Sequence, residues 1–497
     1  MSRVSALRWP LIAVALALVP LAASAKGAAP APSSTASAPA APVPVATPEP
    51  PDIAIPKLQA ALKKDPNDRD ALLKWAQYMY IIKRPDQTVA ATQKLEQLGV
   101  KTAEVYYYEG VAYSDLGNQK EATASLQRAA DLAPTNASVL VRLADLLLKE
   151  KRGAEAERVA QRAITFNKND ASAYDTLGMV YAAEKKYDDA RKQFDIANKM
   201  DPKDTSALML EAQTYLDQKT PQYAIDIYNR VLAANKDSRD AIYGKAHAYA
   251  QAGQISDAVK QYDALLQLDP KNVQIELEVA GLYAAHQQDA DAQKAFQKAV
   301  DDHQGQSLPL ITYGQYWYTK KQSDKAVALW KQALGPKGDD PDALNVLAQY
   351  AMSAGKFADA STYLSKLISV LGPSGATPDL YLGLGQAYMA QNQGQQAHDA
   401  FRKAYDMHAD PVTAMSLAQA DLRVKNYKEA ADLAETVKKK AADFAKQQPV
   451  VYLVAAQAYE GLHQTAAAKE NYQKLLSYAP KNSELAKQAT DAIKRLH

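Results

Sequence analysis

Residues 171–204 read ASAYDTLGMVYAAEKKYDDARKQFDIANKMDPKD, and their side-chain pattern indicates the fold class. Apolar or small side chains recur in it at helical spacing, first as Tyr174, Leu177, Gly178 and Tyr181, then as Ala190, Phe194 and Ala197. Such spacing places each set on one face of a helix. The polar run 184–186 separates the two sets, and Pro202 ends the second helix because proline disfavours helical geometry in the residue before it. The stretch therefore predicts two amphipathic helices joined by a short polar turn.

The same pattern recurs along the chain at intervals of 34 residues. Alanine occupies eight consecutive positions at this interval: Ala122, Ala156, Ala190, Ala224, Ala258, Ala292, Ala326 and Ala360. Four residues further on, a second column holds Leu126, Ala160, Phe194, Tyr228, Tyr262, Phe296, Trp330 and Leu364. Neither helix of a pair can bury its apolar face alone, so neighbouring pairs must stack. The sequence predicts an all-α array rather than several unrelated domains.

The repeated motif resembles the tetratricopeptide repeat (TPR). The family pattern is W-x2-L-G-x2-Y, A-x3-F and P over 34 residues, and residues 174–202 follow it. The resemblance covers residues 69–482 as twelve units, which begin at 69, 103, 137, 171, 205, 239, 273, 307, 341, 378, 411 and 449. It implies an α-solenoid whose helix-turn-helix units form a right-handed superhelix. Residues 52–68 are expected to form a half repeat with an N-terminal capping helix, and residues 483–497 a C-terminal capping helix.

Helix-start signals support these boundaries independently. Proline is tolerated at the first position of a helix, where its missing N–H would be unpaired anyway, and it begins the last four units as Pro341, Pro378, Pro411 and Pro449. Good capping residues precede three of them, namely Asp340, Thr377 and Asp410. The unit that begins at Pro411 is the least regular, because it has Asp421 where an aromatic residue is expected.

The N-terminal residues predict export from the cytoplasm. Residues 1–25 combine a basic start, an apolar segment from Leu11 to Leu21 and the small residues Ala23-Ser24-Ala25, which together are typical of a cleavable signal peptide. The apolar segment contains Pro20 and is short for a membrane span, so a retained anchor is the less favoured alternative. Residues 26–51 are rich in Ala and Pro and predict a disordered spacer. We therefore expect the protein in the periplasm, or secreted, with no integral membrane span after cleavage.

Composition and motifs argue against several classes of function. The chain has no cysteine and only seven histidines. It contains no G-x-x-x-x-G-K-[ST], H-E-x-x-H or G-x-S-x-G motif and no histidine pair at metal-ligand spacing. Without Arg3 and Arg8 of the signal, 56 basic residues balance 56 acidic ones, so nucleic acid is a poor partner. We expect no catalytic residues, no cofactor and no metal.

The candidate binding residues follow from the position of each residue within its unit. Positions 4, 8 and 11 of the first helix face the core, while positions 2, 5, 9 and 12 form a stripe about 100° away. In TPR arrays this neighbouring stripe lines the inner groove, so the resemblance implies a role in binding. At position 9 the candidates are Gln213, His247, Gln315, Gln349, Gln386, Gln419 and Gln457, and at positions 5 or 12 they are Tyr107, Tyr243 and Tyr318.

Glutamine presents both a hydrogen-bond acceptor and two donors. A row of glutamines could therefore pair with the backbone of an extended peptide or with sugar hydroxyls. The alternative is that these glutamines contact only water or their neighbours, and that the tyrosines pack against adjacent units. The leading hypothesis is a non-enzymatic TPR scaffold of the cell envelope that binds a partner protein or peptide during assembly, export or secretion. The second is a glycan-binding TPR module in polysaccharide export.

Overall fold

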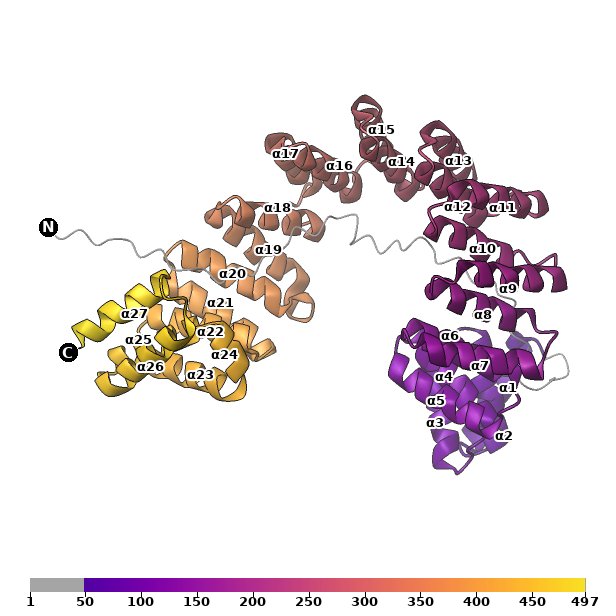
Figure 1. The fold of residues 1–497 in the computed structure, drawn as a ribbon, viewed down its shortest axis with the longest axis horizontal. Helices are drawn as coiled ribbons and strands as arrows, with labels where there is room; N and C mark the ends of the chain where they lie inside the picture. Colours follow the sequence, from indigo (N-terminus) through magenta and orange to yellow (C-terminus); the bar gives the residue numbers. More distant parts are fainter. Residues whose placement is uncertain (1–48, 497) are drawn as a thin grey trace. The chain divides into compact units, whose positions relative to one another are not determined.

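The computed structural model describes residues 49–496, and every regular element in this range is a helix (Figure 1). The predicted signal peptide, and the predicted spacer up to residue 48, lie outside the described residues. The described chain forms two compact bodies, which we call the N-terminal body (residues 49–286) and the C-terminal body (residues 287–496). The division falls in the turn between helices α14 and α15.

The N-terminal body consists of fourteen helices. They are α1 (Pro51–Lys64), α2 (Arg69–Ile81), α3 (Pro85–Gln97), α4 (Ala103–Asp115), α5 (Gln119–Leu132), α6 (Ala137–Lys149), α7 (Gly153–Phe166), α8 (Ala171–Ala183), α9 (Tyr187–Met200), α10 (Ser206–Asp217), α11 (Pro221–Ala234), α12 (Arg239–Gln251), α13 (Ile255–Leu268) and α14 (Val273–Ala285). The first helix of each repeat begins within one residue of the unit start expected from the sequence.

The C-terminal body continues the same alternation. Its helices are α15 (Asp289–Asp302), α16 (Ser307–Thr319), α17 (Ser323–Ala333), α18 (Pro341–Ser353), α19 (Phe357–Gly375), α20 (Pro378–Ala390), α21 (Gly394–Met407), α22 (Pro411–Arg423), α23 (Tyr427–Lys440), α24 (Ala442–Gln447), α25 (Val450–Gly461), α26 (Thr465–Tyr478) and α27 (Glu484–Arg495). Within each body the helices pack as consecutive pairs. The prediction of an all-α solenoid of stacked helical pairs is confirmed.

The two sequence columns form the centre of the stack. All eight alanines of the first column have 0% exposure, and the residues of the second column are at most 5% exposed. Small residues on the first helix allow the close approach: a Cβ added to Gly178 would lie 2.5 Å from Cε1 of Phe194, and one added to Gly385 would lie 2.5 Å from Cδ1 of Phe401. A small residue and an aromatic ring therefore fit together at the contact between the two helices.

The first helices of successive repeats also pack on one another. In the N-terminal body, α2, α4, α6, α8, α10 and α12 contact one another in sequence, and in the C-terminal body α16 contacts α18, α20 contacts α22, and α22 contacts α25. Figure 1 shows α8, α10 and α12 stacked along one side of the N-terminal body. This arrangement brings side chains from the first helices of neighbouring repeats to a common surface.

The turn inside each repeat has the same backbone conformation in all twelve repeats. The fifteenth residue of all twelve repeats has a positive φ, between 55° and 80°. Three of these residues are glycines, Gly117, Gly253 and Gly355, and the other nine are Lys83, Lys151, Lys185, Lys219, Gln287, Lys321, Asn392, Lys425 and His463. Left-handed geometry reverses the chain immediately after the first helix. The sequence had indicated a polar turn here, without its conformation.

Several local predictions need correction. Pro449 is the residue before α25 rather than its first residue, and Thr377 makes no hydrogen bond through its side chain to cap α20. The short helix α24 was not foreseen. Asp340 and Asp410 do cap their helices, accepting hydrogen bonds from the backbone N–H groups of Ala343 and Thr413.

Candidate functional site

A cavity of about 430 Å³ opens between the first helices of two successive repeats, α10 and α12. Its lining residues come from these two helices and from α11: Met209, Gln213, Leu216, Asp217, Tyr228, Asp240, Tyr243, Gly244, His247, Ala250 and Gln251. Gln251 ties the two first helices together, since its Nε2 donates to the backbone oxygen of Leu216 at 3.1 Å. Three of the residues predicted from the stripe pattern, Gln213, Tyr243 and His247, meet in this cavity.

Gly244 and the ring of Tyr228 form one part of the cavity wall. A Cβ on Gly244 would lie 2.4 Å from Cζ of Tyr228, so a larger residue at this position would collide with the tyrosine ring. Tyr228 itself is 2% exposed and belongs to the aromatic column of the core. This part of the wall is therefore an extension of the buried repeat core.

Gln213 is exposed at the mouth of the cavity. Its Nε2 donates to Oδ1 of Asp217, one turn further along α10, at 2.9 Å. This bond is a contact with a neighbouring side chain, which was the alternative role considered for the glutamines. The bond uses one amide hydrogen, and the Oε1 atom is engaged by no hydrogen bond within residues 49–496. The side-chain oxygen can therefore accept a hydrogen bond from a ligand.

The side chains of Tyr243 and His247 both contact a carboxylate of the next repeat. The hydroxyl of Tyr243 donates to Oε1 of Glu278, on α14, at 2.6 Å, and Nε2 of His247 lies 3.8 Å from Oε2 of the same carboxylate. The two rings are 4.6 Å apart, centroid to centroid. Burial, and then the hydrogen bond and the charge of Glu278, raise the pKa of Tyr243. Sequence reasoning did not find Glu278, because its role depends on contacts between α12 and α14.

The charge of the cavity is acidic. Among its lining residues are two carboxylates, Asp217 and Asp240, and none of the lining residues is lysine or arginine. His247, with 47% of its side chain exposed, can add a hydrogen-bond donor or acceptor. The cavity thus combines apolar wall, amide and carboxylate groups in one place.

The five glutamines predicted as a row occupy successive first helices of the C-terminal body. Gln315 lies on α16, Gln349 on α18, Gln386 on α20, Gln419 on α22 and Gln457 on α25, and all five are half-buried. Gln349 donates to Oδ1 of Asn345 in its own helix at 3.2 Å. Nε2 of Gln419 and Oε1 of Gln457 are buried and have no hydrogen-bond partner within residues 49–496. A buried polar atom without a partner costs free energy, which a ligand or water could recover.

The remaining two tyrosines differ from each other. Tyr107 is 2% exposed and its ring packs edge-on against Tyr108, with 5.6 Å between the centroids. At this exposure the ring of Tyr107 cannot reach a ligand in the groove, because residues 105–112 of α4 are all buried. Tyr318 is half-buried and packs against Trp330 and against Tyr350 of the next repeat, at 5.8 and 6.1 Å. Packing between units, the alternative for these residues, describes Tyr318, whereas the ring contact of Tyr107 lies within its own helix.

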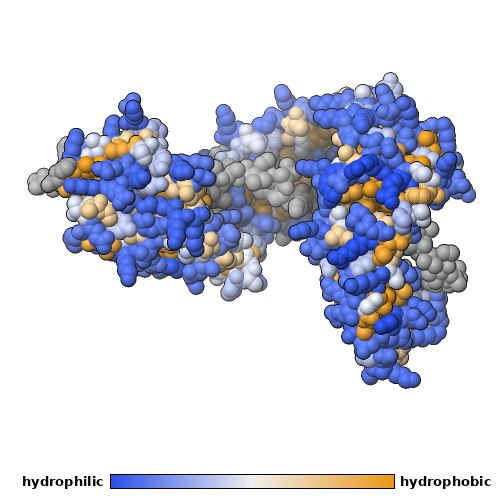
Figure 2. Space-filling view, turned by 60° about the horizontal axis from the view of Figure 1, so that its bottom comes forward, coloured by the Kyte–Doolittle hydropathy of each residue, from blue (hydrophilic) through white to orange (hydrophobic). Residues whose placement is uncertain are grey.

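Hydrophilic side chains cover most of the face drawn in Figure 2, with apolar residues visible between them in short patches. None of the helices in residues 49–496 combines the length and the apolar character needed to cross a membrane.

Family models match most of the repeat region. Tetratricopeptide repeat models match residues 243–307, 382–445 and 450–482, and a model of the C-terminal ARM domain of tetratricopeptide repeat protein 21 matches residues 111–247. The protein is a tetratricopeptide repeat protein. Its repeats extend beyond the matched segments, since the same helix pairs and the same buried columns continue through them.

This TPR protein has distant curated relatives. It is 23% identical to the BBSome complex member BBS4 of Bos taurus over 333 residues, which are 66% of this chain and 63% of the bovine protein. It is 27% identical to the anaphase-promoting complex subunit CDC16 of Saccharomyces cerevisiae over 164 residues, which are 32% of this chain and 20% of the yeast protein. The chain therefore spans less than two thirds of the length of either relative.

Solved structures with similar repeats include MamA and YrrB. MamA is 27% identical, with a TM-score of 0.29, and the match covers 31% of this chain and 90% of MamA. YrrB, described as a TPR protein with an unusual peptide-binding site, is 23% identical, with a TM-score of 0.31 and coverage of 38% and 97%. Both TM-scores lie below 0.5, so these structures do not bear on the function of this TPR protein.

Proposed function

We propose that this protein is a non-enzymatic scaffold of the cell envelope, whose first-helix surface binds a partner protein or peptide during assembly, export or secretion. The observation that carries the proposal is the cavity between α10 and α12, where Gln213, Tyr243 and His247 lie together. A cavity of about 430 Å³ is large enough for one or two side chains of a peptide, because ligand pockets span roughly 300–1,000 Å³.

The lining supports a particular kind of partner segment. Tyr228 and Leu216 offer apolar surface, while Asp217 adds a carboxylate to the lining. A segment that presents a lysine or arginine next to an apolar side chain would complement both features. Gln213, with its acceptor oxygen at the rim, suits the backbone N–H of an extended chain.

A glycan is the second candidate, and the same cavity supports it. Tyrosine rings next to carboxylates and amides can stack on the apolar face of a sugar and accept hydrogen bonds from its hydroxyls. Tyr243, Asp217 and Gln213 provide these three types of group within one cavity. The two candidates differ in the chemistry of the bound molecule, which a crosslinking experiment can identify.

The decisive experiment places a photo-crosslinking amino acid at position 247 of the full chain in cells. Position 223 is the matched control, because Tyr223 is 60% exposed on the second helix α11 of the neighbouring repeat. We expect an adduct at position 247 that protease removes and that is absent at position 223. An adduct sensitive to glycosidases instead would select the glycan. Equal labelling at both positions would contradict binding in the cavity.

The envelope location has a separate test. Support for it comes from residues 1–25, whose composition is typical of an export signal. We expect the protein in the periplasmic or secreted fraction, and a variant without residues 2–25 in the cytoplasm. An intact chain that stays in the cytoplasm would contradict the location while leaving the scaffold proposal open to the crosslinking test.

A further inference from the structure

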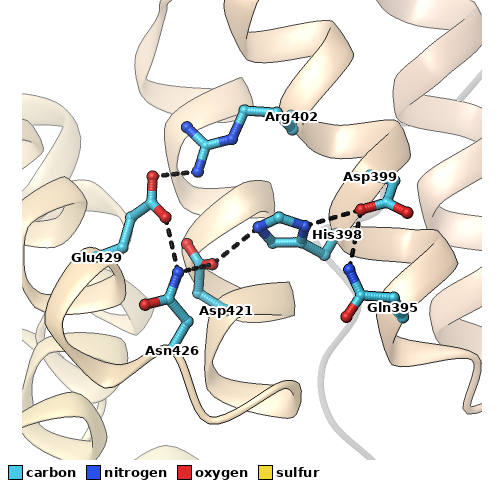
Figure 3. Close-up of polar contacts among 7 residues, drawn as sticks. All are labelled: Gln395, His398, Asp399, Arg402, Asp421, Asn426 and Glu429. Carbon is cyan, nitrogen blue, oxygen red and sulfur yellow. Dashed lines mark hydrogen bonds and ion pairs between the residues drawn. The ribbon is translucent and has the colours of Figure 1, made fainter.

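A polar cluster occupies the junction of two repeats in the C-terminal body, whereas the cavity described above belongs to the N-terminal body. His398 comes from α21, Asp421 from α22 and Glu429 from α23 (Figure 3). One ligand atom from each of these three residues lies within 4.8 Å of the other two. The three helices belong to neighbouring repeats, so the cluster joins side chains that are distant in sequence.

Asp421 is the unusual member of the cluster. It stands where the repeat pattern calls for an aromatic residue, and its side chain has 0% exposure. Its Oδ1 accepts a hydrogen bond from Nδ2 of Asn426 at 3.0 Å and lies 3.2 Å from Nε2 of His398. Its Oδ2 is buried and has no hydrogen-bond partner within residues 49–496. Since burying a carboxylate is costly unless it is paired or bound to a cation, the free oxygen requires an explanation.

Figure 3 shows the Asp421 carboxylate turned toward the space between His398 and Glu429. The other ring nitrogen of His398, Nδ1, is 3.1 Å from Oδ1 of Asp399. An Nδ1–H that donates to Asp399 leaves the lone pair of Nε2 directed at Asp421. A carboxylate behind the imidazole is the usual support for a histidine that binds a metal, because it fixes both the tautomer and the ring orientation.

We propose that His398, Asp421 and Glu429 form a binding site for a divalent transition-metal ion of the zinc class, with water completing the coordination. One imidazole and two carboxylates are ligands that suit such ions. Ligands roughly 2.0–2.2 Å from a tetrahedral ion lie roughly 3.3–3.5 Å from one another, and the His398–Asp421 separation of 3.2 Å is close to this value. The ligand atom of Glu429 lies within 4.8 Å of the other two and would move closer to them when an ion binds.

The surrounding charges agree with a divalent cation. Asp399, Asp421 and Glu429 carry three negative charges, and Arg402, which is paired with Glu429, carries one positive charge. The cluster with a neutral His398 is therefore left with two excess negative charges. Asn426 holds the second oxygen of Glu429 at 2.7 Å. Arg402 is 29% exposed, so its guanidinium can turn to solvent when an ion approaches Glu429.

Solvent reaches the site on the side of Glu429 and His398. Glu429 is 34% exposed and His398 is 18% exposed, while Asp421 closes the inner end. An ion bound here would link α21 to both α22 and α23, and would thereby fasten two neighbouring repeats to each other. The proposed role is structural and does not depend on the function proposed for the cavity.

The test uses the full chain without an affinity tag and titrates it with Zn²⁺ alone by calorimetry, and with Co²⁺ by visible absorption. We expect one bound ion per chain and the intense visible bands of low-coordinate Co²⁺. His398→Gln and Glu429→Gln should each weaken binding at least tenfold, and Asp399→Asn should weaken it about tenfold by loosening the imidazole. The matched control is His408→Gln, because His408 is 69% exposed at the end of the same helix and should leave binding unchanged.

Folding of each variant is checked by circular dichroism, and the two partly exposed ligands are tested because a change at the fully buried Asp421 could unfold the repeat. Unchanged binding in both His398→Gln and Glu429→Gln would overturn the proposal, as would the absence of a bound ion at millimolar Zn²⁺. Equal loss of affinity in His408→Gln would also overturn it, because the ion would then lie elsewhere.

Discussion

Gly314 faces the indole of Trp330 so closely that a Cβ on the glycine would lie 2.3 Å from Nε1 of the ring. Trp330 has 0% exposure, and its N–H donates to the backbone oxygen of Ile311 at 3.1 Å. The ring therefore cannot move away without losing a buried hydrogen bond. This contact determines how closely α16 and α17 approach each other.

Gly314→Ala should destabilise the C-terminal body. The added methyl forces the indole to shift, and overpacking of this kind costs about 1–3 kcal/mol. The measurement is chemical denaturation followed by the fluorescence of the tryptophans. The control is Gly281→Ala, because Gly281 is exposed within α14 and a Cβ there meets nothing within 4 Å. That change should stabilise by about 0.5–1 kcal/mol; equal effects of the two substitutions would contradict the packing argument.

Lys185→Gly should stabilise the repeat that begins at residue 171. Lys185 has a φ of 61°, a left-handed conformation that costs a residue with a side chain roughly 1–2 kcal/mol. Glycine removes that cost but gains freedom in the unfolded chain, so the expected net gain is about 0.5–1 kcal/mol. Thermal unfolding measures it. Gly253→Ala, at the equivalent turn position with a φ of 74°, should have the opposite sign.

Asp175→Asn should change how stability depends on pH. Burial, and then the negative charges of Asp204, Asp145 and Asp170, raise the pKa of Asp175 from 3.8 to about 7. A carboxyl whose pKa is raised on folding stabilises fully below pH 3.8, and this contribution is lost as the pH rises toward 7. The asparagine variant lacks this loss, so it should be more stable than the parent at pH 8, by roughly 1–3 kcal/mol.

Denaturant midpoints measured from pH 4 to pH 8 test this expectation. Asp195→Asn is the control, because that side chain is 56% exposed and paired with Lys199 at the surface. Its effect should stay within about 0.5 kcal/mol. A parallel pH profile for Asp175→Asn and the parent protein would contradict the assignment of the titration to Asp175.

Tyr243→Phe should weaken the contact between α12 and α14. The tyrosine hydroxyl is a hydrogen-bond donor to Glu278, and Oε2 of that carboxylate is buried with no hydrogen bond in residues 49–496. Removing the hydroxyl takes the 2.6 Å hydrogen bond away from this carboxylate, at a cost of about 1–3 kcal/mol. Hydrogen exchange of the amides of α14 would show faster opening. Tyr223→Phe, on the exposed face of α11, should leave that exchange unchanged.

Much of the architecture was predictable because it depends on periodic side chains. The alanine column and the aromatic column specify both the repeat length and the buried face. Asp170, which directly precedes the predicted unit start at 171, caps α8 by accepting from the N–H of Ser172 at 3.1 Å. The turn geometry was not predictable in the same way. Lysine is uncommon with a positive φ, so Lys185 gave no sign of the conformation that Gly253 suggests at the same position.

Candidate site residues were predictable only where they lie on one face of a single helix. Helical spacing identified Gln213, Tyr243 and His247, which meet in one cavity. Spacing could not identify Glu278, because it reaches Tyr243 from another repeat. For Tyr107, position within the unit did not separate core from groove, because residues 105–112 of α4 are all buried. Asp421 was visible only as an exception to the aromatic pattern.

Packing that is concentrated within a repeat and between adjacent repeats has a mechanical consequence. In each body the main contacts between helices join elements of the same repeat or of adjacent repeats within residues 49–496. A pulling force or a protease would therefore loosen such a body from its weakest joint and peel it one pair at a time, with force plateaus spaced by a single repeat length.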